Sequence, residues 1–335
     1  MIDRREFLTR TALGAAALTL PRSQALPTRA IDAPTGMFVS LPPWAVARNV
    51  GWPEQARLAA RVGYKGIDWA FGPAKAAGVD ATRALLADLA IEPTIVNLPM
   101  RDALGPDDAA FDAQLPALAE DAAFCRAIGC NRFQLVLGPT TPNGQPKAER
   151  WALVQRRLSA LSAVLAKQDV RLGLEFLGPL VFRTRRNRPG AAPADPSAPL
   201  PPPPVPFVWT LGETLALCDA SGPNVGVTLD AWHWYHAGGT VADIRAAKAS
   251  RIIHVHVSDA RTMPPEEVRD DMRLLPGEGV IDLIGFFQAL KAIGYQGGVA
   301  PETIGPRIPD GMPPEVSARL ALDATTAVMR KAGVA

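Results

Sequence analysis

Four short apolar segments in the second half of the chain each carry an acid or a histidine at or near their end. The segments cover residues 171–175, 225–230, 252–256 and 297–302, and the residues in question are Glu175, Asp230, His256 and Glu302. If the segments are successive strands of one parallel barrel, these side chains meet at the C-terminal ends of the strands, where barrel enzymes keep their chemistry. Three carboxylates and one imidazole form an oxygen-rich set of ligands. Such a set suits one divalent metal ion, Mn²⁺ or Mg²⁺ first, with Co²⁺ and Zn²⁺ as alternatives.

All four histidines of the chain fall within 24 residues, and they are His233, His236, His254 and His256. Strand alternation puts His254 and His256 on the same face, which for the end of a barrel strand is the interior. His256 lies nearer the C-terminal end and is the expected ligand. We expect His254, one layer lower, to be a hydrogen-bonded residue of the core or a support for the ligands.

From Gly36 onward, strand-like and helical segments alternate, and these elements must position the residues named above. The expected strands cover residues 37–40, 66–69, 94–97, 132–137, 171–176, 225–230, 252–256 and 297–302. The expected helices cover 54–62, 81–90, 109–128, 148–167, 210–220, 241–249, 281–293 and 315–331. Eight units of this kind predict a single-domain (β/α)8 TIM barrel over residues 36–335. A doubly wound open sheet is the alternative, but no glycine-rich phosphate loop follows the first strand.

The first 25 residues are interpreted as a targeting segment and not as part of the barrel. Arg4 and Arg5 precede Phe7 and Leu8, and an uncharged stretch then leads to a small-x-small pattern ending at Ala25. This arrangement resembles a twin-arginine export signal, which predicts a periplasmic or extracellular product. The apolar stretch is too short for a comfortable membrane span, so no stable membrane insertion of the mature chain is expected. Beyond this segment the basic and acidic residues balance at 31 each, which argues against a nucleic-acid partner.

One segment interrupts the barrel pattern. The segment 183–206 begins with four arginines in residues 183–188. Its remainder, residues 189–206, contains nine prolines and cannot form a helix or a central strand. Because the segment follows the strand that ends near Glu175, we expect a surface loop at the mouth of the site. It is either a lid or docking arm, or a tolerated insertion.

The three cysteines, Cys125, Cys130 and Cys218, show no metal-type clustering. We expect them to be small buried side chains, and a bridge between Cys125 and Cys130 stays open as an alternative. A disulfide framework is not what holds this chain together.

Several aromatic and polar residues follow the early strands and the strand that ends at Asp230. Aromatic rings stack on the apolar faces of sugars and cyclitols, so some of these rings should form the wall of a pocket. The candidates for substrate contact are Trp44, Trp69, Trp232, Asn97 and Gln134. Asp68 is a further candidate for binding a hydroxyl group.

The motifs of the second half are similar to those of the xylose isomerase-like barrel superfamily. Within it, they most resemble the sugar phosphate isomerase/epimerase group, which includes ketose 3-epimerases and inosose dehydratases. The motifs are Leu174-Glu175, Leu229-Asp230-Ala-Trp-His233, His254-Val-His256-Val-Ser-Asp259, Leu275-Pro-Gly-Glu-Gly279, and Ile293-Gly-Tyr-Gln-Gly297 followed by Glu302. One departure is Val181, at a position where epimerases of this group often carry a second acid.

The resemblance implies roles for individual residues. Glu175, Asp230, His256 and Glu302 would hold one divalent metal, and the two glutamates would also exchange protons with the substrate. His233 would bind a substrate oxygen or transfer a proton. Arg273 and Glu278 match positions near the mouth of the site, where they would contact substrate or stabilise the loop.

These observations favour a metal-dependent isomerase or epimerase that acts on a keto-sugar, cyclitol or related polyol through an enediolate. A dehydratase or lyase acting on an oxidised sugar or inosose is the first alternative, and a non-catalytic exported sugar-binding protein is the second. An apurinic endonuclease-like phosphodiesterase would need further zinc ligands that the early strands do not offer. A periplasmic sugar oxidoreductase that supplies the keto-substrate, and a second copy of this chain, are the expected partners.

Overall fold

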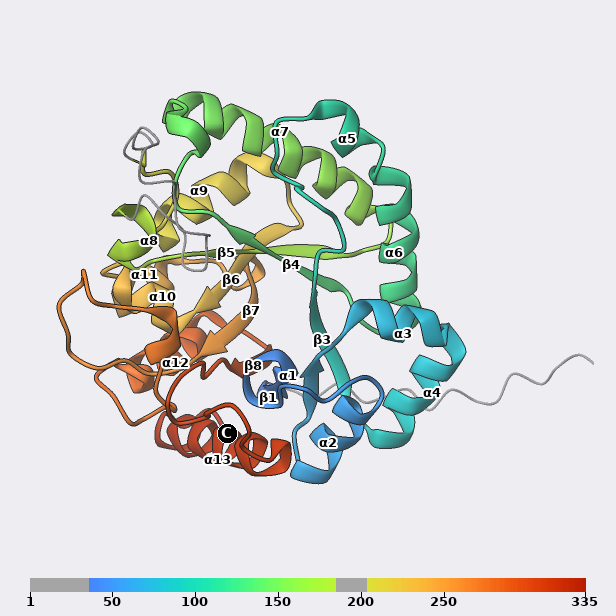
Figure 1. Ribbon diagram of the computed structural model, residues 1–335, viewed down its shortest axis with the longest axis vertical. Coiled ribbons are helices and arrows are strands. Elements are labelled where there is room, and N and C mark those ends of the chain that lie inside the picture. The colour runs from blue at the N-terminus through green and yellow to red at the C-terminus, as the bar shows by residue number, and fades with distance from the viewer. Residues whose placement is uncertain (1–35, 185–203) are drawn as a thin grey trace, which may run out of the picture. The chain divides into compact units, whose positions relative to one another are not determined.

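Eight parallel strands form a closed barrel in the computed structural model, which describes residues 36–184 and 204–335 (Figure 1). Each strand pairs with its neighbours in chain order, and β8 returns to β1, with Met37 paired to Gly297. The strands are β1 (Met37–Leu41), β2 (Gly66–Asp68), β3 (Glu92–Asn97), β4 (Arg132–Leu137), β5 (Arg171–Phe176), β6 (Val225–Asp230), β7 (Ile252–Val257) and β8 (Gly297–Pro301). The predicted single (β/α)8 barrel is therefore confirmed.

Helices lie around the strands, and the last helix closes the ring by packing against the second helix and the first strand (Figure 1). The main helices are α2 (Glu54–Val62), α4 (Val79–Leu89), α6 (Leu115–Ala127), α7 (Lys147–Ala166), α9 (Leu211–Ser221), α11 (Val241–Ala246), α12 (Leu283–Ile293) and α13 (Pro314–Lys331). Shorter helices are α1 (Pro43–Val46), α3 (Phe71–Ala77), α5 (Asp108–Asp112), α8 (Leu180–Thr184) and α10 (Ala231–His236). Three 3-10 turns complete the set, η1 (Pro142–Gly144), η2 (Ala249–Arg251) and η3 (Asp270–Met272).

Two of the expected helices were too long. The segment 109–128 is divided into α5 and α6, because Gln114 turns its side chain to the backbone of Arg101 and Pro116 starts a new helix in its first turn. A proline is tolerated there since the first helical N–H groups have no intrahelical partner. The segment 241–249 ends as a helix at Ala246, and the chain then enters η2.

The local sequence explains where several helices begin and end. Thr210 and Asp282 precede α9 and α12, and each side chain accepts a hydrogen bond from a backbone N–H of the first turn. Gly63 and Gly294 end α2 and α12 in the left-handed conformation that glycine adopts without strain. These signals set the lengths of the helices, and hence the places where the chain returns to the barrel.

The barrel interior is filled by side chains, and small residues make room where the strands approach. Strands β6 and β7 are buried along their whole length, as expected for parallel strands covered on both faces. Gly173 of β5 faces Thr228 of β6, and a Cβ atom at this glycine would lie 2.4 Å from the threonine hydroxyl. The layer of side chains below the C-terminal ends of the strands therefore fills the barrel interior, and Glu175 and Asp230 lie one layer above it.

Two expectations lie wholly or largely outside the described residues. The export signal at residues 1–25 is one, and most of the proline-rich segment, 185–203, is the other. Just beyond the latter, the N–H of Thr141 donates to the carbonyl of Val205, and the N–H of Phe207 donates to that of Pro139. The returning chain is thus joined to the loop that follows β4.

The described part of the chain contains all three cysteines and no membrane-spanning helix. Cys125, Cys130 and Cys218 are buried free thiols, so the alternative of a Cys125–Cys130 bridge is not observed. Among the described residues, no helix combines the length and the apolar character that crossing a membrane requires.

Candidate metal centre

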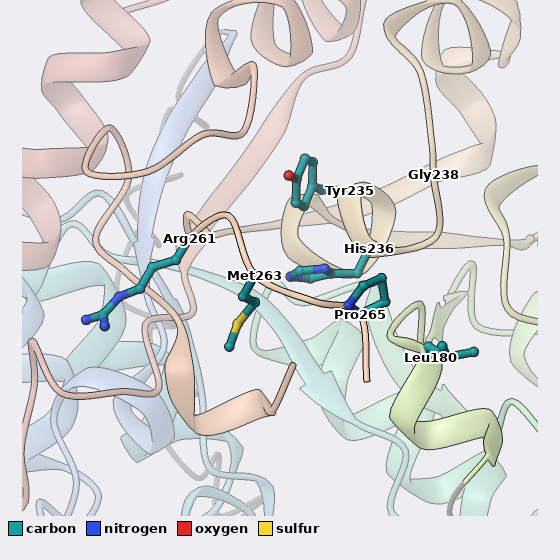
Figure 2. A pocket seen from close by; sticks show the side chains of 7 residues that line it. All are labelled: Leu180, Tyr235, His236, Gly238, Arg261, Met263 and Pro265. Atoms are coloured by element: carbon teal, nitrogen blue, oxygen red, sulfur yellow. The ribbon is translucent and has the colours of Figure 1, made fainter. Parts of the chain in front are cut away.

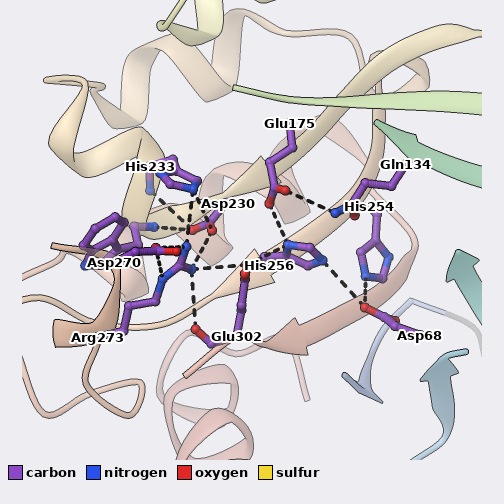
Figure 3. Close-up of polar contacts among 11 residues, drawn as sticks. Asp68, Gln134, Glu175, Asp230, His233, His254, His256, Asp270, Arg273 and Glu302 are labelled. Atoms are coloured by element: carbon purple, nitrogen blue, oxygen red, sulfur yellow. Dashed lines mark hydrogen bonds and ion pairs between the residues drawn. The ribbon is translucent and has the colours of Figure 1, made fainter. Parts of the chain in front are cut away.

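Glu175, Asp230, His256 and Glu302 come together at the C-terminal ends of the last four strands (Figure 3). One ligand atom from each of these residues lies within 4.8 Å of those of the others, and all four residues are buried. The Nδ1 atom of His256 lies 2.8 Å from a carboxylate oxygen of Glu175 and 2.9 Å from one of Glu302. The backbone N–H of Glu302 donates to the carbonyl of Val257, which continues the pairing of β7 with β8 and fixes the height of this acid.

Arg273 reaches into the same cluster from the loop after β7. Its guanidinium donates to Asp230 at 2.7 Å and to Asp270 at 2.7 Å, and it lies 3.2 Å from a carboxylate oxygen of Glu302. Only 1% of its side chain is exposed, and the Trp232 ring covers it at 4.7 Å. A buried, paired guanidinium of this kind holds carboxylates in defined positions.

His233 stands beside the arginine at the start of α10. Asp230 positions it, because one oxygen of that carboxylate accepts the backbone N–H groups of Trp232 and His233 and so caps the helix. The Nε2 atom of His233 lies 3.3 Å from a guanidinium nitrogen of Arg273. Arginine can only donate, so Nε2 accepts and the proton of the neutral ring is on Nδ1. That Nδ1 is buried and makes no hydrogen bond within the described residues.

A second set of polar side chains lies on the other side of the His256 ring. Asp68, at the end of β2, has one oxygen 3.1 Å from Nε2 of His254 and 3.6 Å from Nε2 of His256. Its other oxygen accepts the hydroxyl group of Ser40 and lies 2.6 Å from that of Thr94. Asp68 thus belongs to the barrel interior and is not placed as an open hydroxyl binder.

The environment shifts the pKa values of the cluster in opposite directions. Burial raises the pKa of Glu302 to about 8, although Arg273 and His256 act against it. Burial would lower the pKa of His256, but the carboxylates of Glu175 and Glu302 raise it well above its ordinary value. Burial also opposes ionisation of Asp230, yet Arg273 holds the pKa of this acid below its usual range. Without a metal, the cluster therefore retains a proton around neutral pH.

The donor set fits a divalent metal ion. The Oε2 atom of Glu302 is buried and makes no hydrogen bond of good geometry within the described residues, although Arg273 and His256 lie in ion-pair range. An unsatisfied buried carboxylate oxygen is costly, and a cation would satisfy it. Three carboxylates and an imidazole leave coordination positions open for substrate, as in catalytic sites. The four side chains that would hold the ion are the four expected from the sequence.

The rim of the cluster carries exposed apolar surface. The Trp44 ring lies 5.8 Å from that of His256 and 42% of the residue is exposed. Val136 pairs in register with Glu175 and therefore points to the same side of the sheet, yet it is 46% exposed. An inward side chain with such exposure marks an open mouth. Gln134, one layer lower, donates to Glu175 at 3.1 Å.

Three of the expected substrate contacts are not brought to the cluster. Trp69 is buried among aromatic residues and packs against Phe124, because α3 and α6 cover the end of β2. Asn97 is exposed at the end of β3, and its side chain makes no hydrogen bond or ion pair with the described residues of the cluster. Glu278 forms an ion pair with Arg307 at the surface, which supports its alternative role as a stabiliser of the loop.

Sequence reasoning missed two participants, Asp270, which pairs with Arg273, and Val136, which lines the mouth. Asp68 was expected to bind a hydroxyl group of the substrate, and its contact with the histidines of β7 was not foreseen. The repeat of His254 and His256 on one face was the signal that something polar lies beneath the ligands. Nothing in the sequence indicates that the partner comes from β2, on the opposite side of the barrel.

A separate cavity of about 230 Å³ lies beside α10 (Figure 2). It is lined by side chains from α8, α10 and the loop after β7, including His236, Arg261 and Met263. Burial lowers the pKa of His236 to about 4, so its ring is neutral. None of the four candidate ligands lines this cavity, although Trp232, 4.5 Å from the ring of His236, also covers Arg273.

Residues 56–328 match the family model described as xylose isomerase-like TIM barrel. An inosose isomerase of Halalkalibacterium halodurans is 31% identical over 125 residues, which are 37% of this chain and 44% of that protein. The match therefore spans less than half of this relative.

Solved structures agree with the fold over most of the chain. A xylose isomerase domain protein from Alicyclobacillus acidocaldarius superposes with a TM-score of 0.75 and 27% identity, covering 89% of this chain and 99% of that one. The IolI protein, solved with a zinc atom, gives a TM-score of 0.70 and 21% identity over 88% of this chain and 99% of its own. At that identity the IolI match shows the fold alone.

Proposed function

Because the chain belongs to the xylose isomerase-like TIM barrel family, we propose that it is a metal-dependent isomerase or epimerase of a keto-sugar, a cyclitol or a related polyol. The observation that carries this proposal is the meeting of Glu175, Asp230, His256 and Glu302 within 4.8 Å at the open end of the barrel. Of the four possible ions, Mn²⁺ is proposed, since oxygen atoms dominate the set of ligands. The name of the inosose isomerase relative supports a small polyol substrate.

The proposed reaction is proton transfer next to a carbonyl group. Glu175, Asp230, His256 and Glu302 would hold the divalent ion, which would supply a positive charge that favours removal of a proton next to a carbonyl group. Glu175 and Glu302 lie on two sides of the His256 Nδ1 atom, so each can face the substrate from a different direction. One carboxylate takes the C–H proton, and the other returns a proton to another carbon or to the other face.

The neighbouring side chains would hold the substrate oxygens. The Nδ1–H group of His233 is a buried donor whose other ring nitrogen is occupied by Arg273, so it is suited to donate to an oxygen and not to remove a proton. Trp44 and Val136 offer apolar surface for the C–H faces of a sugar ring. Thr228 and His254, which lie below the cluster, are completely buried, so this side of the site is closed to solvent.

Solvent deuterium exchange tests the proposal. The Mn²⁺-loaded protein is incubated in D₂O with a panel of ketoses and inososes, and NMR measures the loss of the C–H signal next to the carbonyl. We expect exchange and a new isomer with at least one compound, and neither with a Glu175→Gln, Glu302→Gln double variant. Exchange followed by loss of water would identify the dehydratase instead. Binding of a sugar without exchange at any metal load would overturn the proposal in favour of a binding protein.

A further inference from the structure

Asp68 is the acidic side chain nearest the Nε2 atom of His256, on the edge of the ring that points away from the candidate ligands. The Nδ1 atom of His256 faces Glu175 and Glu302, while Nε2 faces Asp68 at 3.6 Å and has no hydrogen-bond partner within the described residues (Figure 3). The ring itself is completely buried. Its two nitrogens therefore face two different sets of acids.

A histidine binds a metal through an unprotonated nitrogen, so its proton must be on the other one. For His256 this means that Nε2 carries the hydrogen and needs an acceptor, because a buried N–H without one costs free energy. Carboxylates commonly fill this position behind metal-bound histidines, where they fix the ring and make it a better ligand. Asp68 is the nearest carboxylate on this side, and a small movement would bring it into hydrogen-bond distance.

Asp68 is itself held in place from three directions. His254 lies 3.1 Å from one of its oxygens, and the hydroxyl group of Ser40 donates to the other at 2.7 Å. The Thr94 hydroxyl lies 2.6 Å from that same oxygen and 2.8 Å from the carbonyl oxygen of Ile67, and it can donate to either of them. The carboxylate is buried, with 4% of the residue exposed. Such a set of contacts fixes the position of one oxygen and leaves the other facing the two histidines.

We propose that Asp68 is a positioning residue for the metal centre, which keeps His256 in the tautomer that presents Nδ1 to the ion, with His254 holding the carboxylate in place. The inference rests on the proposed metal site. In this arrangement His254 of β7 and Asp68 of β2 support the metal ligand His256 from within the barrel interior.

The same three residues also have the composition of a small cation site, since their ligand atoms lie within 4.8 Å of one another. Two observations favour the positioning role. One oxygen of Asp68 is already occupied by hydroxyl groups, and His254 is packed so tightly that a Cβ on Gly298 would lie 3.0 Å from its ring. Little room is left for an ion with its own water.

Metal affinity provides the test, and it needs no substrate. Co²⁺ is titrated into the metal-free protein and into Asp68→Asn, with affinity and stoichiometry followed by the visible absorption of the ion. We expect one Co²⁺ per chain in both proteins and binding weakened about 10–100-fold in the variant. Thr325→Val is the matched control, because it removes a fully buried hydroxyl that donates to the carbonyl of Ala321 in α13 and touches neither Asp68 nor the candidate ligands. It should lower stability without changing the affinity.

Each contrary result has a distinct meaning. Equal affinity in Asp68→Asn overturns the positioning role and leaves the proposed function intact. Two ions in the wild type and one in the variant would make Asp68 a ligand of a second ion. No binding by the wild type would overturn the proposed function and this inference together.

A second measurement uses the wild type alone, in case the variant does not fold. The chain has only four histidines, so ring nitrogen NMR of the Zn²⁺-loaded protein can resolve each one. We expect His256 to be protonated at Nε2, with a hydrogen-bonded proton that exchanges slowly with solvent. Protonation at Nδ1, or a rapidly exchanging Nε2 proton, would overturn the inference.

Discussion

At the scale of single residues, the pKa of Glu302 links metal binding to pH. Metal ligands must be deprotonated, and burial raises the pKa of this carboxyl to about 8. Below that pH the ion must displace this proton in addition to the one that His256 holds, so we expect affinity to rise by at least about tenfold per pH unit as the pH increases toward 8, and more gradually above it. Calorimetry in buffers of different ionisation enthalpy measures both the affinity and the released proton. A flat profile between pH 6 and 8 would contradict this account.

Removal of the buried Arg273 side chain should lower the stability of the protein substantially. This side chain pairs with Asp230 and Asp270 while almost completely buried, and loss of one partner from a buried ion pair costs about 3–5 kcal/mol. We therefore expect Arg273→Met to lower the free energy of unfolding of the metal-free protein by that amount in urea titrations. Arg307→Met removes an exposed pair with Glu278 and should change stability little. Equal effects of the two substitutions would show that burial does not govern this network.

At the scale of elements, the loop after β5 supports helix α10 and thereby His233. Gly178 lies so close to the helix that a Cβ atom would be 1.9 Å from the carbonyl oxygen of His233. We expect Gly178→Ala to displace α10 and cost about 1–3 kcal/mol of stability, with weaker substrate binding. Gly72→Ala, in α3 with open space around it, is the control and should be neutral or stabilising by about 0.4–1 kcal/mol. Urea unfolding compares the two, and an equal response would contradict the close packing.

At the scale of the whole molecule, metal binding should be coupled to folding. The candidate ligands come from β5, β6, β7 and the end of β8, so the site forms only when these four strands have assembled into their part of the barrel. An ion that binds only the folded chain adds about 2.7 kcal/mol at one hundred times its dissociation constant. Thermal unfolding with Mn²⁺ and with EDTA should therefore differ by several degrees, about 2–4 °C for each kcal/mol.

The double variant Glu175→Gln, Glu302→Gln is the control for that coupling. It keeps the shape of both side chains and replaces two carboxylate ligands by neutral amides, so it should unfold at the same temperature with and without Mn²⁺. The same metal-dependent rise in the variant would mean that the ion binds elsewhere on the molecule.

Much of this architecture could be read from the order of the residues. Apolar runs of four to six residues alternate with helical patterns, which predicted the barrel, and β4, β5 and β6 have the expected bounds. Strand alternation and the position of each acid at a strand end were enough to name the four side chains that meet at the mouth. These are properties of local spacing, because a parallel barrel brings the ends of all its strands to one rim.

Only the tertiary structure decided which other residues share that rim and which turn away from it. Trp69 directly follows the end of β2, as Glu302 follows β8, yet helix packing places it in an aromatic cluster of the core. Asp68 ends the same strand and crosses the barrel interior to the histidines of β7. Contacts between strands on opposite sides of a barrel depend on how it closes and which side chains fill its centre, and no local pattern in the sequence encodes either.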